Sequence, residues 1–230
     1  MTTIVDGTTG ITTPTYNGNV TAEYLVPVTA FKNRIINGAM VIDQRNAGAS
    51  TTPTASGYTL DRWRAGLSVA SKFSVQQSST APTGFNNSLL VTSLSAYTVG
   101  SGEQFTIAQR IEGYNWADLN YGSANAKTIT ISFWVRSSLT GTFGGSLRNI
   151  DQTRSYPYSY TISSANTWEQ KTVTITGDTT GTWNTNNSGG VILLFNIGTG
   201  STYLGTAGSW GSTAYNGTTG SVSLLSLIHI

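Results

Sequence analysis

The sequence predicts an all-β protein, a sandwich or barrel of about ten antiparallel strands. Apolar and polar residues alternate with a period of two in one segment after another, as is typical of strands with one face in a core. The stretches between these segments are rich in Gly, Asn and Thr, which favour turns and loops. Charged residues are only 10% of the chain, but the patterned apolar segments are sufficient to build a core, so a disordered chain is not expected.

The clearest strand covers residues 128–136. Its odd-numbered positions are apolar, whereas the even-numbered ones are polar except for Trp134, which shares a face with Ser132 and Arg136. An aromatic plane held there by a sheet suits a sugar, because the ring covers the apolar side of a pyranose while polar neighbours bind its hydroxyl groups. The alternative is that a loop or another chain covers Trp134.

The chain divides into a short first segment and one large domain. Residues 1–32 contain turn signals and two prolines that interrupt regular strands, so we expect a stem or attachment segment, or a frayed terminus. From Asn33 the apolar alternation becomes dense, and the main domain is expected over residues 33–224. Residues 1–6 show no secretory signal, which leads us to expect a protein made in a cytoplasm.

Within this domain we expect ten strands, separated by polar loops. The first is broken at Asn37-Gly38 by a bulge or turn, and only residues 114–119 resemble a helical turn. The expected strands lie at residues 34–42, 58–65, 69–75, 89–91, 105–111, 128–136, 141–148, 156–162, 168–175 and 191–197.

Composition excludes several classes of function. The net charge of +2 comes from scattered residues with no basic run, so no nucleic-acid partner is expected. No apolar run approaches the roughly 18 residues of a membrane helix, and the absence of Cys excludes disulfides and thiolate chemistry. With His229 as the only histidine, we expect neither a Ser-His-Asp or Cys-His site nor a zinc site.

Paired carboxylates are the remaining route to catalysis, as in glycoside hydrolysis. Glu103, Glu112 and Asp118 are close in sequence, and Asp43 and Asp61 flank the first strands. Most acidic residues lie beside an Arg or at a turn, where a solvated ion pair is the ordinary explanation. We therefore expect a protein that is not an enzyme.

Four segments carry a resemblance to a known family: residues 33–40, 61–63, 129–136 and 166–175. In this order they resemble the carbohydrate-binding-module-like domain of phage tail fibre and tail spike proteins. The resemblance implies a jelly-roll sandwich displayed on a virion fibre, often as a homotrimer, in contact with bacterial surface glycans. Residues 1–32 are similar to the connecting segments of such proteins, which implies attachment to other tail proteins.

The end of the chain departs from this family, whose domains finish with a further strand and a segment containing Gln-Leu-Glu. Residues 225–230 read Leu-Ser-Leu-Ile-His-Ile and resemble the translation of the transposon-end adapter used in sequencing libraries. We therefore expect an artefactual tail and a truncated domain, whose sheet edge is open to association. The alternative is a genuine C-terminal strand.

We expect sugar contacts from residues on the central strand and on the strand pair that follows it. Trp134 and Arg136 lie on the first, and Arg148, Arg154 and Tyr156 on the second. The expected function is non-catalytic recognition of a glycan, and the alternative is a structural trimeric domain of a fibre or baseplate that binds no sugar.

Two loop aromatics and three aspartates complete the candidate residues. Trp183 and Trp210 lie in Gly- and Asn-rich loops, where a large ring either folds back onto the core or meets a ligand. The family resemblance implies a structural Ca²⁺ held by backbone carbonyls and carboxylates, for which Asp43, Asp61 or Asp178 would serve. No other cofactor is expected.

Overall fold

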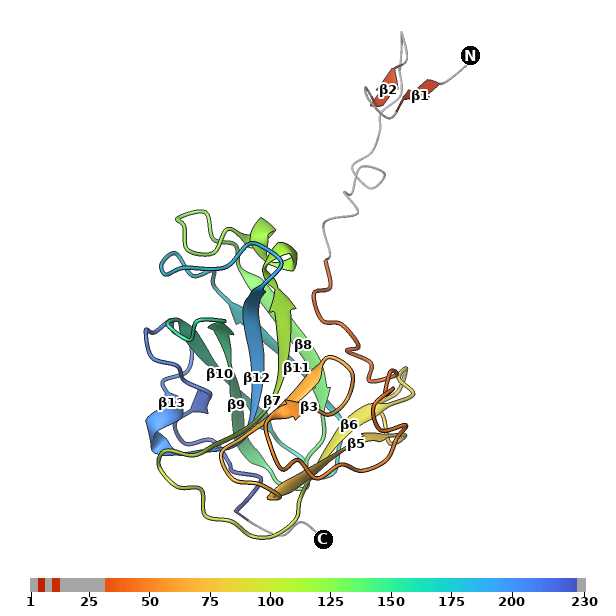
Figure 1. Ribbon diagram of the computed structural model, residues 1–230, viewed down its shortest axis with the longest axis vertical. Helices are drawn as coiled ribbons and strands as arrows, with labels where there is room; N and C mark the ends of the chain where they lie inside the picture. The colour runs from red at the N-terminus through yellow and green to blue at the C-terminus, as the bar shows by residue number, and fades with distance from the viewer. Residues whose placement is uncertain (1–3, 7–9, 13–31, 227–230) are drawn as a thin grey trace. The chain divides into compact units, whose positions relative to one another are not determined.

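The computed structural model describes residues 4–6, 10–12 and 32–226 (Figure 1). The chain divides into two compact units, Met1–Asn33 and Arg34–Ile230. In the first unit, β1 (Ile4–Asp6) pairs antiparallel with β2 (Gly10–Thr12). Most of the predicted stem lies outside the described residues.

The second unit is all-β, as predicted, and its described helical parts are three short 3₁₀ turns: η1 (Gly113–Asn115), η2 (Ala117–Leu119) and η3 (Ser201–Tyr203). The first two fall in the segment where the sequence predicts a helical turn. A six-stranded sheet in the order β10-β9-β12-β7-β4-β3 dominates the unit, and all its neighbouring strands are antiparallel. Its strands are β3 (Gly57–Tyr58), β4 (Trp63–Leu67), β7 (Gln104–Glu112), β9 (Gly141–Asn149), β10 (Ser155–Ile162) and β12 (Gly189–Thr199).

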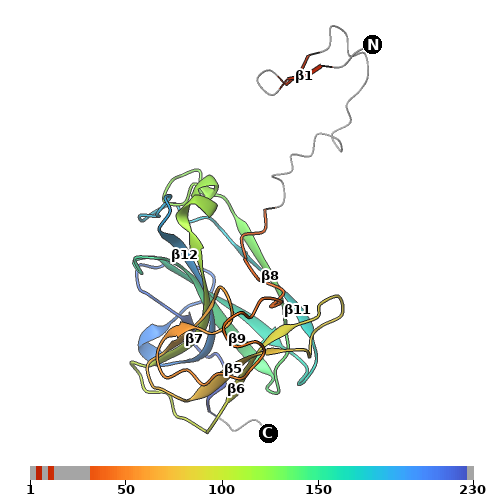
Figure 2. The same ribbon diagram turned by 45° about the vertical axis from the view of Figure 1, so that its right-hand side comes forward.

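The other described strands of this unit form separate pairs and do not join into a second continuous sheet. The pairs β5–β6 and β8–β11 are antiparallel, and β13–β14 is parallel. In both Figure 1 and Figure 2, β8 and β11 run side by side. The bounds of these strands are β5 (Phe73–Ser78), β6 (Ser88–Ser93), β8 (Ile129–Val135), β11 (Glu169–Ile175), β13 (Leu204–Gly205) and β14 (Gly217–Thr218).

The core lies between one face of the six-stranded sheet, called the core face below, and the two antiparallel pairs. One cluster joins core-face residues such as Leu147 and Leu193 to Ile131 and Ile175 of β8 and β11. A second cluster joins core-face residues to β5 and β6. The period-two pattern produces this arrangement, since alternate side chains of each strand point to the same layer.

Residues 34–42 do not form the predicted strand. The side chain of Gln109 takes the place of a neighbouring strand, because its Oε1 accepts from the Ile36 amide at 2.8 Å and its Nε2 donates to the Ile36 carbonyl at 2.8 Å. The predicted turn at Asn37-Gly38 is present, with Asn37 in the left-handed region at φ 55°. The strand prediction was therefore wrong in its hydrogen-bond partner and in its burial, since Ile36, Val41 and Ile42 are 43%, 55% and 44% exposed.

The described chain ends against the second core cluster. Leu225, the first residue of the predicted tail, is fully buried. Its carbonyl accepts from the Tyr97 amide at 2.6 Å, and the Leu224 amide donates to the Ile197 carbonyl at 2.8 Å. Residues 227–230 lie outside the described part of the chain.

Candidate functional site

The pair β8–β11 has one side in the core and one side exposed. Along β8 the odd-numbered residues are half-buried and the even-numbered ones are exposed, so the strand has the orientation that its sequence pattern predicts. Trp134 is 40% exposed and lies opposite Gln170 of β11. Within the described residues no hydrogen bond or ring contact engages its indole.

Small polar side chains surround this ring. The outward positions of the two strands form what we call the Trp134 face: Thr130, Ser132, Trp134, Gln170, Thr172 and Thr174. Gln170 Nε2 donates to Ser132 Oγ at 3.3 Å. Beyond the end of β8, exposed Arg136 donates from Nε to the Asn166 carbonyl at 2.8 Å. An aromatic plane with hydroxyl and amide neighbours on a regular sheet has the chemistry that stacking on a sugar ring requires.

The three candidates on β9, on β10 and in the turn between them do not reach the Trp134 face. Tyr156 points into the core, and Arg148 lies on the opposite surface of the six-stranded sheet, where its Nη1 donates to Asn216 Oδ1 at 2.6 Å. Arg154 forms an ion pair with Asp178 at 2.7 Å. The alternation within a strand does not reveal that Arg148 binds Asn216 or that Arg154 binds Asp178, because both partners come from distant segments.

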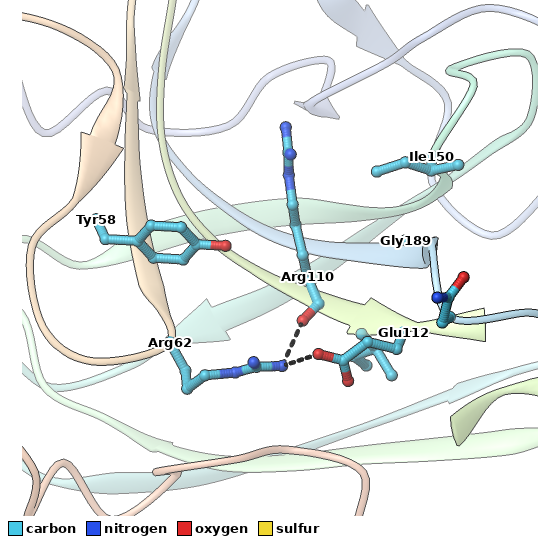
Figure 3. Close-up of a pocket in the computed structure, with 8 residues that line it drawn as sticks. Tyr58, Arg62, Arg110, Glu112, Ile150 and Gly189 are labelled. Carbon is cyan, nitrogen blue, oxygen red and sulfur yellow. Dashed lines mark hydrogen bonds and ion pairs between the residues drawn. The ribbon is translucent and has the colours of Figure 1, made fainter. Parts of the chain in front are cut away.

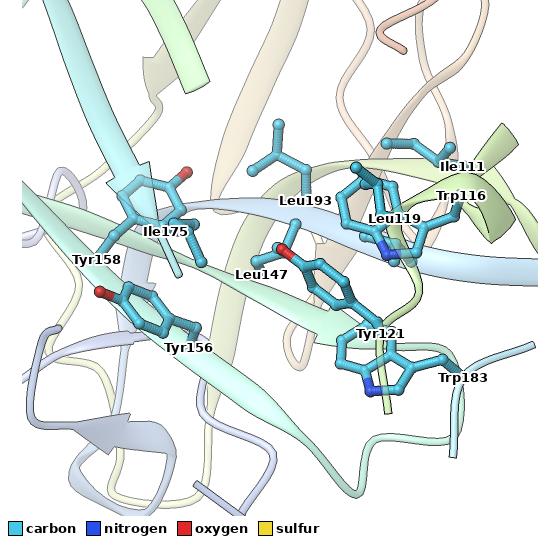
Figure 4. Close-up of a cluster of buried hydrophobic side chains, with 11 residues drawn as sticks. Ile111, Trp116, Leu119, Tyr121, Leu147, Tyr156, Tyr158, Ile175, Trp183 and Leu193 are labelled. Atoms are coloured by element: carbon cyan, nitrogen blue, oxygen red, sulfur yellow. The ribbon is translucent and has the colours of Figure 1, made fainter. Parts of the chain in front are cut away.

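Trp183 and Trp210 fold back onto the core. Their rings lie 5.4 Å apart between centroids, and both lie against Tyr121, at 4.9 and 5.8 Å respectively. Trp210 Nε1 also donates to the Thr176 carbonyl at 2.8 Å. Figure 4 shows the side chains of Tyr121, Trp183 and Trp116 together in this cluster. Of the two alternatives for a loop aromatic, the structure shows the first.

The aspartates expected to bind Ca²⁺ are engaged within the protein. The carboxylate of Asp43 accepts from the amides of Asn46 and Gly48, at 3.1 and 2.8 Å, and Asp61 accepts from the Gln44 amide at 2.7 Å. Asp178 has its guanidinium partner. Across the described residues, no cluster of three or more His, Asp or Glu side chains is arranged to hold a metal ion. The Ca²⁺ prediction therefore relies on the family resemblance alone.

The acids considered for hydrolysis are engaged as well. Glu103 accepts from the Tyr97 hydroxyl at 2.8 and 2.9 Å, and Asp118 forms two bonds with Arg34, at 2.8 and 2.7 Å. Glu112 pairs with Arg62 at 2.8 Å, and this hydrogen bond lowers the pKa of Glu112. A general acid needs a raised pKa, so Glu112 has the wrong shift for that role.

A pocket lies at the end of β7 and was not anticipated from the sequence. Its volume is about 290 Å³. Figure 3 shows Arg62 directed at Glu112, whereas the Arg110 side chain extends away from them on the side of the Tyr58 hydroxyl. The only feature of the sequence that points to this pocket is Arg110, at an outward position of the predicted strand. The pocket is lined by Tyr58, Arg62, Arg110, Ile111, Glu112, Ile150, Asn187 and Gly189.

No protein-family model matches the chain, and no curated protein does. Among solved structures, the chain is similar to the enzymatically active domain of tailspike protein 4 of bacteriophage CBA120, with a TM-score of 0.38 and 15% identity over 80% of this chain. The similarity covers 21% of that protein, so this chain spans about a fifth of its length. At this TM-score the similarity assigns neither a fold nor a function. No helix in the described residues has the length and apolarity to cross a membrane.

Proposed function

We propose that the chain is a non-catalytic domain of a phage tail fibre that binds a bacterial surface glycan through the Trp134 face. The observation that carries this proposal is the exposed indole of Trp134, 40% accessible on a regular strand pair. The hydroxyl and amide groups beside it suit the hydroxyl groups of a saccharide. The jelly-roll topology, the homotrimer and attachment to other tail proteins through residues 1–32 follow from the family resemblance.

The state of the acidic side chains supports binding without hydrolysis. Glycosidases use two carboxyl groups about 5–9.5 Å apart across the scissile bond, one of them with a raised pKa. Glu103, Glu112 and Asp118 each have a hydrogen-bond donor of their own. Hydrogen bonds lower the pKa of Glu112 and of Glu169, the opposite of the shift that a general acid needs.

The rival proposal is a structural fibre domain that binds no sugar. Trp134 favours it too, because an exposed aromatic side chain is also what a subunit interface covers. Among the described strands, none pairs with the outer edges of β8 and β11, and such edges are open to association. Under this rival the Trp134 face is buried between protomers.

A glycan array separates the two. We expect the chain to retain a defined set of bacterial glycans and Trp134→Ala to bind them at least about tenfold more weakly, equivalent to roughly 1.4 kcal/mol. Tyr114→Ala is the matched control, because Tyr114 is 67% exposed and lies in η1, outside this face. Equal binding by Trp134→Ala would remove the face from the site. A trimer that Trp134→Ala converts to monomer would support the rival.

A further inference from the structure

Three arginines from three strands lie on the outer face of the six-stranded sheet, the surface opposite the core face. Arg64 of β4 is paired with Ala108, which lies two residues before Arg110 on β7. Arg110 and Arg148 of β9 are both paired with Ile192 of the intervening β12. Because paired residues point to the same side and strands lie about 4.8 Å apart, these three side chains gather on one surface, called the arginine face below.

Among the described residues, no carboxylate forms an ion pair with Arg64, Arg110 or Arg148. Glu112, two positions after Arg110 on the same side of β7, is paired with Arg62. The other ion pairs of the described residues are Arg34–Asp118, Arg154–Asp178 and Lys171–Glu169. Burial and the positive charge of Arg110 lower the pKa of Arg148 to about 10. The same two causes lower the pKa of Arg64. Because a guanidinium is charged at neutral pH, the face has three like charges, none with an ion-pair partner among the described residues.

Buried polar atoms without partners lie on the same surface. Arg148 is only 7% exposed, and its Nη1 is bound to Asn216 while its Nε has no partner among the described residues. The Oγ atoms of Ser146, on the same side of β9, and of Thr218 also have none. Buried polar groups are nearly always satisfied by protein, water or an ion. The inner side of the arginine face therefore suits buried water, whereas the exposed Arg110 is the part that an anion from outside reaches.

The pocket opens beside this charge. Its volume of about 290 Å³ is close to the lower end of ligand pockets, roughly 300 Å³. Tyr58, which is 46% exposed, lines it together with Arg110, and Tyr58 is the strand partner of Arg64. The Arg45 guanidinium lies over the Tyr58 ring, 5.5 Å from its centroid, and the rest of this half-exposed ring lines the pocket with Arg110, which has no ion-pair partner among the described residues.

We propose that the arginine face binds the anionic group of an acidic saccharide, a carboxylate, phosphate or sulfate, with Arg110 and Arg64 holding the anion and Tyr58 lying against the sugar ring. Guanidinium groups bind such anions through paired, charge-assisted hydrogen bonds. That the anion belongs to a saccharide depends on the proposed function. The anion site itself depends only on the arginines and on the pocket that Arg110 and Tyr58 line.

The test uses two probes with the same sugar chain, tri-galacturonate and its uncharged methyl ester, titrated into the full chain by calorimetry. We expect the acid to bind at least about tenfold more tightly than the ester, with an advantage that shrinks as salt rises. Arg110→Gln should abolish the advantage. The matched control is Lys127→Gln, which removes one exposed positive charge ahead of β8 and should preserve it. Thermal unfolding checks that each variant is folded.

Titrations with inorganic phosphate and sulfate show whether the site binds any anion or requires a sugar that carries one. The inference holds if the acid binds more tightly than either inorganic ion and both preferences are lost in Arg110→Gln. It is overturned if acid and ester bind equally, if Arg110→Gln keeps the advantage, if the inorganic ions bind as tightly as the acid, or if no anion binds at millimolar concentration. The proposed function fails by a different result. If Trp134→Ala still binds glycans as the unchanged protein does, the Trp134 face is not the glycan site, even where Arg110→Gln still loses its preference for the acid.

Discussion

Arg154 and Asp178 form the most buried ion pair described in this chain. Asp178 is 2% exposed and accepts from Arg154 Nε at 2.7 Å and from Nη2 at 2.8 Å. The amide and hydroxyl of Thr180 also donate to it, both at 3.1 Å. This network holds the start of the loop that carries Trp183, so both charges have a structural role.

Asp178→Asn should therefore destabilise the protein, because it leaves the Arg154 guanidinium without its counter-charge. We expect a loss of about 3–5 kcal/mol in the free energy of unfolding, as for other broken buried pairs, measured by urea denaturation. Asp151→Asn, in an exposed turn, is the control and should change stability little. Equal stability of the two variants would contradict the structural role.

Glu112 gives a prediction for pH. The hydrogen bond from Arg62 lowers its pKa below the ordinary value of 4.5. A lowered pKa in the folded state means that the pairing stabilises the protein above the ordinary pKa and is lost as pH falls through the folded one. Carbon-13 NMR titration of the carboxyl group should place the midpoint below 4.5, and Arg62→Gln should raise it. An unchanged midpoint in Arg62→Gln would show that the pair does not set this pKa.

The sequence predicts the orientation of some side chains but not of others. The outward position of Trp134 follows from alternation within its own strand, and the structure has it outward. Trp183 and Trp210 could not be placed in this way, because their positions depend on Tyr121, from a distant loop. The same holds for Arg148, whose partner Asn216 lies in a segment without a regular pattern.

At the level of elements, the pairing of β9 with its neighbours depends on Gly145, which leaves room for a side chain of β10. The Tyr158 side chain of β10 crosses over Gly145, and its hydroxyl donates to the Leu194 carbonyl of β12 at 2.7 Å. A Cβ atom at Gly145 would collide with that hydroxyl and that carbonyl. β9 can therefore pair with both neighbours only if this position has no side chain.

Gly145→Ala should destabilise the protein by about 1–3 kcal/mol or more, the usual effect of overpacking a core. Gly102→Ala is the matched control, since no atom lies within 4 Å of its added Cβ. Denaturant midpoints of both variants check the prediction. If Gly145→Ala is as stable as Gly102→Ala, Tyr158 does not lie over β9 as described.

Strand prediction succeeds or fails for an identifiable reason. The strands β8 to β12 all lie where alternation predicts them. Residues 34–42 are also rich in apolar residues but form no strand, because the Gln109 side chain supplies the hydrogen bonds to Ile36. Strand formation requires a backbone partner as well as apolar residues, and without one Ile36, Val41 and Ile42 stay exposed.

At the scale of the whole molecule, the end of the described chain contributes to the core. Leu225 is fully buried in the second core cluster. We expect Leu225→Ala to cost about 2–5 kcal/mol, because the cavity remains when a buried leucine is truncated. Leu94→Ala, at a 45% exposed leucine, is the control in the same urea titration. Equal effects would mean that the domain does not need Leu225.

The all-β class could be predicted from composition and alternation, but the division into sheets could not. Pairing between distant strands decides which sheets form, and it also creates the arginine face from Arg64, Arg110 and Arg148. These residues lie up to 84 positions apart, as 148 minus 64 shows. No local pattern marks them as neighbours.

NMR of the tryptophan indoles tests the central claim most directly. The chain has six tryptophans, and each indole N–H signal can be assigned by substitution. A saccharide retained on the array should shift the signal of Trp134 more than any other, since this ring is exposed and without a partner among the described residues. If a bound saccharide leaves Trp134 unmoved, the Trp134 face is not the binding site.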